Sequence, residues 1–156
     1  MRAGPGGALL VAGLILLHFI LRPLLTSWPI GPDLLTGALL LGALRLRAGP
    51  AALLGFFLGL FDASMALKGM GALMIVYTFA GFAAAKSRDL LFSDSAVFVP
   101  TFLFVGVWAV QVAVAGFAGG LDLMFGLVIA PLSAVSTALF CWLAARVVGF
   151  AFRGVR

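Results

Sequence analysis

Long apolar runs separated by short polar connections make up most of this chain. A helix needs about 20 predominantly apolar residues to cross the hydrocarbon core of a bilayer. The runs therefore predict transmembrane helices at residues 7–25, 30–46, 50–66, 70–86, 96–116 and 124–147. We expect an all-α membrane protein in which residues 1–156 form a single domain, a bundle of six transmembrane helices.

The second apolar run is shorter than the others. Its continuous apolar part, Leu34–Leu44, would be only about 16 Å long at 1.5 Å per residue. A helix of that length has to recruit its flanking residues, tilt little, or be shielded from lipid by its neighbours. Asp33 precedes it directly and is predicted to be its N-cap, with the carboxylate facing the positive end of the helix.

Composition supports the membrane interpretation. Apolar residues make up 64% of the chain and charged residues 10%, with a mean hydropathy of +1.26. Typical soluble domains contain about 25% charged residues, and a small domain keeps much of its surface exposed to water. The composition therefore excludes a soluble enzyme and a disordered chain. The lone Cys141 excludes a disulfide framework, and we interpret it as a buried hydrophobic residue.

The basic residues indicate an orientation. With the N-terminus inside, eight of them fall on the inner face and only Arg22 and Lys68 on the outer face. The inner residues are Arg2, Arg45, Arg47, Lys86, Arg88, Arg146, Arg153 and Arg156. This asymmetry predicts that both termini are cytoplasmic. It also explains the pI near 10.8 by orientation and by attraction to anionic lipid, so we expect no nucleic-acid partner.

Groups that carry out chemistry are scarce. The chain has no glutamate, one histidine and one cysteine, and it lacks the common metalloprotease, nucleophile-elbow and phosphate-loop signatures. We therefore expect no catalytic residues, no cofactor and no metal ion. Hydrogen bonds across helices are the favoured role for His18 and Gln111, with a ligand or relay role as the alternative. Pro131 is expected to kink the last helix.

Small residues at helical spacing predict close approach between helices. Gly55 and Gly59 form one such face, for packing within the bundle or for docking a partner's helix, and Gly81 and Ala85 form a second close-approach face. Asp62 follows the first face near the end of its predicted helix, where a carboxylate is unfavourable. We expect it to cap a short turn over residues 63–68 or to pair with Lys68.

About a third of the chain, from Pro32 to Phe82, carries an ordered set of motifs. The set comprises Pro32-Asp33-Leu34-Leu35, Arg45-x-Arg47 with Gly49-Pro50, Gly55-Phe56-x-x-Gly59-Leu60-x-Asp62, and Gly71-x-Leu73-x-x-x-Tyr77-x-x-x-Gly81. Together these motifs resemble the bacterial rod shape-determining protein MreD family. The sequence departs from the family pattern after Asp62, where residues 63–68 stand in place of a turn rich in Gly and Ser.

The resemblance implies a non-enzymatic component of the cell-elongation machinery for peptidoglycan synthesis in the bacterial inner membrane. It implies direct binding to MreC and, in the wider complex, association with RodA, its penicillin-binding transpeptidase and MreB. The implied fold is like that of the substrate-binding components of energy-coupling vitamin transporters. We expect Gly55 and Gly59 to supply the face for the MreC helix, with Asp33 and Asp62 holding its outer end.

An alternative function is a small-molecule-binding membrane subunit of an energy-coupling transporter. The pair Ala8-x-x-x-Ala12 is of the kind that such subunits use against a transmembrane partner, although ordinary packing also explains it. This function requires a cavity in the outer half of the bundle on which several polar groups converge. His18, Trp108 and Gln111 are the obvious candidates for those groups.

Overall fold

The computed structural model describes residues 5–25, 31–66, 70–91, 98–118 and 121–153. These residues form six α-helices and no strands. The helices are α1 (Pro5–Leu25), α2 (Leu34–Ala43), α3 (Ala48–Ala66), α4 (Met70–Leu91), α5 (Phe98–Ala118) and α6 (Leu121–Arg153). The sequence therefore predicted the type and order of the helices in this part of the chain, with bounds that differ by a few residues.

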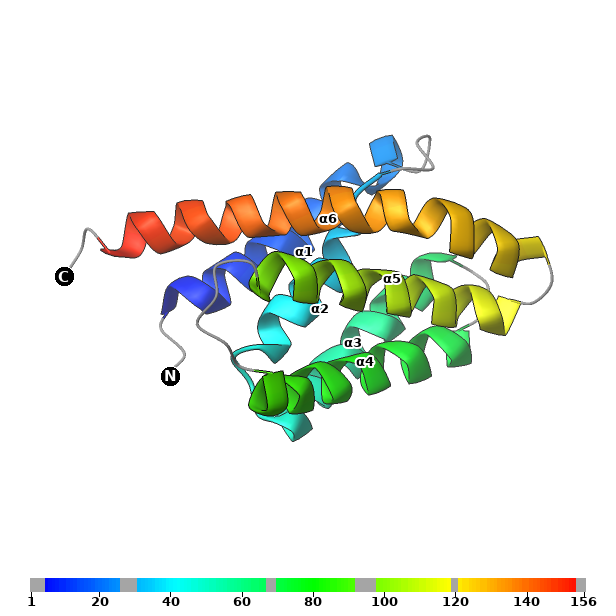
Figure 1. Cartoon of the computed structure of the whole chain (residues 1–156), viewed down its shortest axis with the longest axis horizontal. Helices are drawn as coiled ribbons and strands as arrows, with labels where there is room; N and C mark the ends of the chain where they lie inside the picture. Colours follow the sequence, from blue (N-terminus) through cyan, green and yellow to red (C-terminus); the bar gives the residue numbers. More distant parts are fainter. Residues whose placement is uncertain (1–4, 26–30, 67–69, 92–97, 119–120, 154–156) are drawn as a thin grey trace.

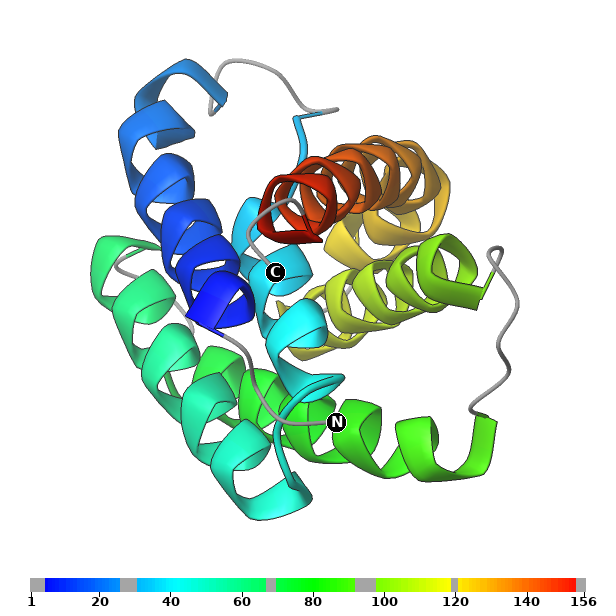
Figure 2. The ribbon, with the colours of Figure 1, turned by 90° about the vertical axis from the view of Figure 1, so that its left-hand side faces the viewer.

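Successive helices run in alternating directions along one axis (Figure 1). The start of α1 and the end of α6 therefore lie at the same end of the bundle (Figures 1 and 2). The turn between α2 and α3 lies there too, because a side chain at Gly7 would collide with the Arg45 guanidinium. Because an even number of helices alternate in direction, the first helix begins and the last helix ends on the same side of the bundle (Figure 1).

Helix α2 is the centre of the bundle (Figure 2). All of its residues are buried, and it contacts each of the other five helices. A helix that is apolar on every side is expected to be buried in this way. The observed helix, Leu34–Ala43, is shorter than the predicted span 30–46. The other helices shield α2 from the surroundings, which is one of the three ways in which so short a helix was expected to be accommodated.

Helices α3 and α4 pack through glycines. A methyl group on Gly55 would overlap the carbonyl oxygen of Tyr77, and one on Gly81 would overlap the carbonyl oxygen of Ala51. A methyl group on Gly59 would lie 2.8 Å from the carbonyl oxygen of Leu73. The backbones of the two helices therefore approach each other directly, as small residues allow in membrane proteins.

The outside of the bundle is apolar. Large side chains that are more than half exposed include Leu9, Leu16, Phe57, Ile75, Phe79, Phe117, Val128 and Val147. Helices α3, α5 and α6 contain the windows Ala48–Met65, Phe98–Phe117 and Leu127–Val147, which are long and apolar enough to cross a membrane. The other helices contain shorter apolar segments at Gly6–Leu21, Leu34–Ala43 and Gly71–Ser87. An apolar exterior around such helices indicates a membrane protein.

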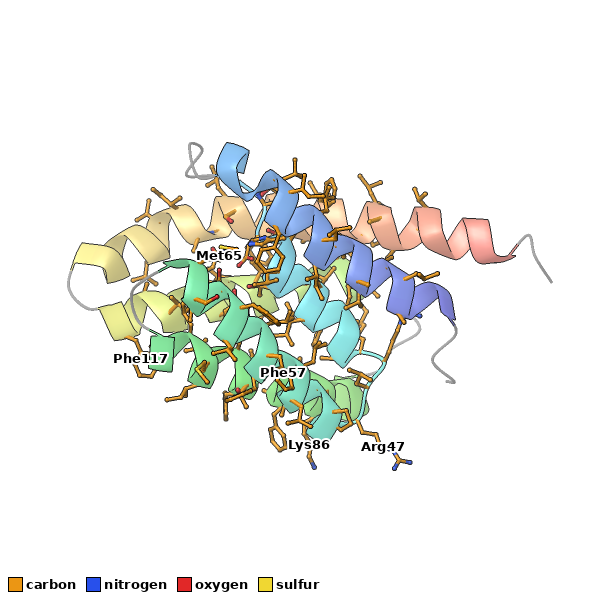
Figure 3. The ribbon with its side chains drawn as sticks, turned by 180° about the vertical axis from the view of Figure 1, so that it is seen from behind. Arg47, Phe57, Met65, Lys86 and Phe117 are labelled. Atoms are coloured by element: carbon orange, nitrogen blue, oxygen red, sulfur yellow. The ribbon has the colours of Figure 1, made fainter. Side chains whose placement is uncertain are left out.

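The two ends of the α3–α4 pair differ in chemistry. Arg47 and Lys86 lie at one end, whereas Met65 lies towards the other, as does Phe117 of the neighbouring α5 (Figure 3). On α6, the Arg146 guanidinium lies 4.8 Å from the centre of the Trp142 ring, a cation–π contact. Basic and aromatic side chains of this kind are typical of a membrane interface.

Helix α6 contains Pro131, the residue at which we expected a kink. Pro131 lies inside the helix, which extends from Leu121 to Arg153. Further along the helix, Thr137 and Cys141 are completely buried, and Cys141 faces Gly37 of α2. The prediction that Cys141 is a buried hydrophobic residue is confirmed.

Candidate functional site

The start of α2 is held by polar contacts at its N-cap. The Asp33 carboxylate accepts hydrogen bonds from the Thr36 backbone N–H at 3.1 Å and from the Thr36 hydroxyl at 2.5 Å. The predicted cap is therefore confirmed. The backbone N–H of Asp33 in turn donates to the Thr137 hydroxyl at 2.8 Å, which ties the start of α2 to the middle of α6.

Thr36 also joins α2 to α4. Its hydroxyl lies 3.0 Å from the Tyr77 hydroxyl, and both side chains are almost completely buried. A hydroxyl has one hydrogen to donate, and that of Thr36 goes to Asp33. The Thr36 hydroxyl therefore links the N-cap of α2 to Tyr77 of α4.

A second chain of hydrogen bonds joins α5 to α6. The Gln111 side-chain amide nitrogen donates to the Ser133 hydroxyl at 3.0 Å, and that hydroxyl donates to the carbonyl oxygen of Gly31 at 3.0 Å. The Thr137 hydroxyl donates to the carbonyl oxygen of Ser133 at 2.7 Å. The predicted hydrogen bond of Gln111 across helices is confirmed, and the Ser133 contact fixes which end of the amide is the nitrogen.

Asp33, Tyr77 and Gln111, three of these polar residues, line a cavity of about 340 Å³. It lies where α2 and α4 begin and where α3 and α5 end. The lining residues are Asp33, Asp62, Leu73, Tyr77, Val110, Gln111, Val114 and Ala115. The cavity therefore combines two carboxylates, a phenol and an amide with an apolar wall. We call it the carboxylate cavity.

Asp62 does not cap a separate turn. Residues 63–66 continue α3, so the carboxylate lies in the last turns of that helix and borders the carboxylate cavity. The expectation that residues 63–68 form a separate turn was wrong for residues 63–66, which continue the helix within the predicted span 50–66. One more turn of helix forms beyond it, in which the Ser64 hydroxyl donates to the carbonyl oxygen of Phe61. Lys68, the other expected partner, lies outside the described residues.

Gly55 and Gly59 have a different neighbour from the one that we expected. Both are buried, and the backbone of α4 lies directly on them. The face that we assigned to a partner's helix is therefore occupied within the bundle, which was the alternative left open. The other two residues of the expected surface, Asp33 and Asp62, come together at the carboxylate cavity instead.

Two of the three groups considered for a binding cavity lie elsewhere. His18 packs edge-on against Phe19, with 5.7 Å between the ring centres, and Trp108 is 38% exposed. Neither lines the carboxylate cavity, whereas Gln111 does.

Sequence reasoning missed the hydroxyls of Thr36, Ser133 and Thr137. Each lies inside an apolar run, where serine and threonine are common and do not by themselves indicate a functional site. A signal was nevertheless present, because Thr36 stands at the capping distance from Asp33 and Ser133 is one helical turn before Thr137.

A second hollow lies on the outer surface of the α3–α4 pair. This groove measures about 540 Å³ and its lining is almost entirely apolar. It is lined by Ala52, Phe56, Gly71, Met74, Ile75, Thr78, Phe79 and Phe82. Phe79 is 70% exposed, and a methyl group on Gly71 would meet no atom within 4 Å. We call it the phenylalanine groove.

Comparison of the chain with protein-family models, with curated proteins and with solved structures gave no match. Among the residues that the structure describes, no group of three or more His, Cys, Asp or Glu side chains is placed to hold a metal ion.

The N-cap can be tested by mutation. Replacing Asp33 with alanine removes both acceptors of Thr36, a residue that is completely buried. We expect Asp33→Ala to lower the free energy of unfolding by about 2 kcal/mol. Asp33→Asn keeps an acceptor for the Thr36 N–H and should cost clearly less. Thermal unfolding in detergent, followed by tryptophan fluorescence, measures both; equal stabilities of the two variants would contradict this role.

Proposed function

We propose that this protein is a non-enzymatic scaffold of the bacterial cell-elongation complex and that it binds the transmembrane helix of MreC. In this proposal all six helices lie in the cytoplasmic membrane and both termini are cytoplasmic. RodA, its penicillin-binding transpeptidase and MreB join through the wider complex.

The observation that carries the proposal is the arrangement of residues 32–82. Asp33 caps α2, Tyr77 reaches α2 through Thr36, and the glycines of both α3 and α4 lie in the contact between those helices. The residues that resemble the MreD family therefore form one packed unit of α2, α3 and α4. Motif residues that contact one another in the structure favour the resemblance to the MreD family more strongly than the same residues would if they were scattered over the molecule.

The phenylalanine groove is the surface that we propose for MreC. It belongs to the same packed unit, and it lies on the side of α4 away from the carboxylate cavity. Helices associate in lipid through van der Waals packing, and small residues let their backbones approach closely. Ala52 and Gly71 provide such small positions in the groove, with phenylalanines beside them.

Gly71 allows a sharp test of this surface. The Cβ atom of a leucine there would have open space, since nothing lies within 4 Å of its position, and Gly71 lines the groove. We expect Gly71→Leu to reduce the MreC recovered by co-purification in mild detergent about tenfold, which corresponds to about 1.4 kcal/mol of binding free energy. Gly13→Leu is the matched control, because Gly13 of α1 is equally open but lies outside the groove.

The outcomes separate the parts of the proposal. Failure of the wild-type protein to co-purify with MreC would contradict the function itself, and co-purification of an ATPase pair would favour the transporter alternative. Loss of MreC in Gly13→Leu with retention in Gly71→Leu would move the docking surface from the groove to α1, where Ala8 and Ala12 are also exposed.

A further inference from the structure

We propose that Arg45, Arg47 and Lys86 bind the phosphate group of an anionic membrane lipid. Arg45 and Arg47 lie between α2 and α3, and Lys86 lies in the last turns of α4. We call these three residues the basic cluster. The proposal goes beyond the proposed function and does not depend on MreC, because none of the three residues lines the phenylalanine groove.

The contact between α3 and α4 brings Arg47 and Lys86 to the same end of the bundle. A methyl group on Gly81 of α4 would overlap the carbonyl oxygen of Ala51 of α3, so these two residues lie side by side. The carbonyl oxygen of Arg47 accepts a hydrogen bond from the Ala51 N–H at 2.9 Å, which places Arg47 one turn before that contact. Lys86 follows Gly81 in α4, which runs in the opposite direction to α3 (Figure 1). Both side chains therefore project at one end of the helix pair, with their nitrogen atoms outermost (Figure 3).

Arg45 is held at this end by its contact with α1. Its guanidinium lies where a side chain at Gly7 would otherwise be, so the backbone of α1 packs against it. Gly7 is buried, whereas Arg45, Arg47 and Lys86 are all exposed. The basic cluster therefore combines positive charges from the α2–α3 turn and from α4, and each of them is open to the surroundings.

Two acidic residues lie at the other end of the same helices. Asp33 precedes α2 and Asp62 lies in the last turns of α3, and both line the carboxylate cavity. The arginines of the basic cluster lie at the opposite ends of α2 and α3, in the turn that joins the two helices. Beyond Lys86, the sequence of α4 adds Arg88 and Asp89, whose charges cancel. The basic cluster therefore gives its end of the bundle a net positive charge.

The position of the cluster along the helices favours a lipid headgroup. The window of α3 that is apolar enough to cross a membrane begins at Ala48, the residue after Arg47. The apolar segment of α4 ends at Ser87, the residue after Lys86. Both cations therefore lie where the hydrocarbon of a bilayer meets its headgroups, and anionic headgroups at that depth attract Lys and Arg side chains.

Exposed carbon lies next to the cluster on α3. Leu53 and Phe57 are 61% and 53% exposed, and neither belongs to the phenylalanine groove. An anionic lipid offers a phosphate at the depth of the cations and acyl chains at the depth of these two side chains. A soluble phosphate ester would match only the cations. We therefore assign the basic cluster to a lipid, on a surface separate from the one that we propose for MreC.

The test uses the purified full chain in nanodiscs that contain equal amounts of phosphatidylcholine and phosphatidylglycerol. Phosphatidylcholine is the control lipid, because its quaternary ammonium cancels the charge of its phosphate, whereas phosphatidylglycerol keeps a net negative charge. Native mass spectrometry counts the molecules of each lipid that stay bound when the protein is released. MreC is absent from the sample, so the result is independent of the proposed function.

We expect the wild-type protein to retain phosphatidylglycerol in preference to phosphatidylcholine. Arg47→Gln and Lys86→Gln should each reduce this preference about fivefold, since each removes one positive charge at the headgroup layer. Lys86→Arg keeps the charge and should bind as wild type. Arg22→Gln is the matched control, because it removes one positive charge near the end of α1, at the opposite end of that helix from Gly7. Added sodium chloride should weaken the preference, because salt screens exposed charges.

Three results would overturn the proposal. These are equal retention of the two lipids by the wild-type protein, an unchanged preference when Arg47→Gln and Lys86→Gln are combined, and an equal loss of preference in Arg22→Gln. Soluble glycerol phosphate then separates the two sources of a phosphate group. Displacement of phosphatidylglycerol by glycerol phosphate would assign the basic cluster to a soluble phosphate ester instead, and retention of the lipid in its presence supports the lipid.

Discussion

The Gly55→Ala variant is expected to unfold at a clearly lower temperature than the wild-type protein. The added methyl group would overlap the carbonyl oxygen of Tyr77, which belongs to the backbone of α4 and cannot rotate away. To relieve the overlap, α3 and α4 must separate along their contact. Overpacking of this kind costs about 1–3 kcal/mol, and more where backbone has to move, which exceeds the gain of up to about 1 kcal/mol from replacing a helical glycine.

The contact between α3 and α4 is reciprocal, and this gives a second variant. A methyl group on Gly81 of α4 would overlap the carbonyl oxygen of Ala51, just as a methyl group on Gly55 of α3 would overlap that of Tyr77. Gly81→Ala should therefore destabilise the bundle by a similar amount. Gly13→Ala is the control, since a methyl group there meets nothing within 4 Å. Thermal unfolding in detergent measures all three, and equal stability of Gly55→Ala and Gly13→Ala would disprove the close approach.

This contact also changes how a substitution at Gly59 is interpreted. A leucine there would collide with the backbone of α4 at Leu73 and Met74. Loss of MreC from a Gly59→Leu variant would thus report damage to the bundle rather than a blocked docking surface. Gly71→Leu avoids a collision with the backbone of α4, because nothing lies within 4 Å of the Cβ position at Gly71.

The Gly37→Ala variant is expected to have the second large effect, because Gly37 lies in the central helix. Its added methyl group would collide with the Cys141 sulfur and would lie 3.2 Å from a methyl carbon of Thr137. Both residues of α6 are completely buried, so neither has free space to move into. We expect a loss of about 1–3 kcal/mol in the free energy of unfolding.

A double variant identifies the cause. Cys141→Ala removes the sulfur that the new methyl group would meet, so Gly37→Ala should cost less in that background than in the wild type. The coupling free energy of such neighbouring substitutions is about 0.5–3 kcal/mol. Unfolding of the wild type, both single variants and the double variant in detergent completes the cycle. Strictly additive effects would show that Gly37 and Cys141 do not pack against each other.

The elements that the sequence predicted best depend on local chemistry. Apolar runs of sufficient length locate the helices, and Asp33 before such a run indicates an N-cap, because both signals involve neighbouring residues only. The errors arose at places where no local signal marks a boundary. The predicted span 30–46 contains a helix of only ten residues, and residues 63–66, which we expected in a turn after Asp62, belong to α3.

The candidate site was predictable in part. The sequence singled out Asp33, Asp62, Tyr77 and Gln111 one by one, but nothing in their spacing showed that they border one cavity. They come from four different helices, and their meeting depends on how those helices pack. The hydroxyls of Ser133 and Thr137 were overlooked for the same reason, since their partners at Gly31 and Asp33 are more than 100 residues away.

The sequence by itself determined that this chain is helical, that its surface is apolar and that few groups are available for chemistry, because these properties follow from composition and from the lengths of the runs. Only the tertiary structure decided which apolar helix is central and which are outside, since every run is apolar and no polar stripe tells them apart. It also decided that Gly55 and Gly59 face α4, because small residues permit close approach to any helix and do not specify which one.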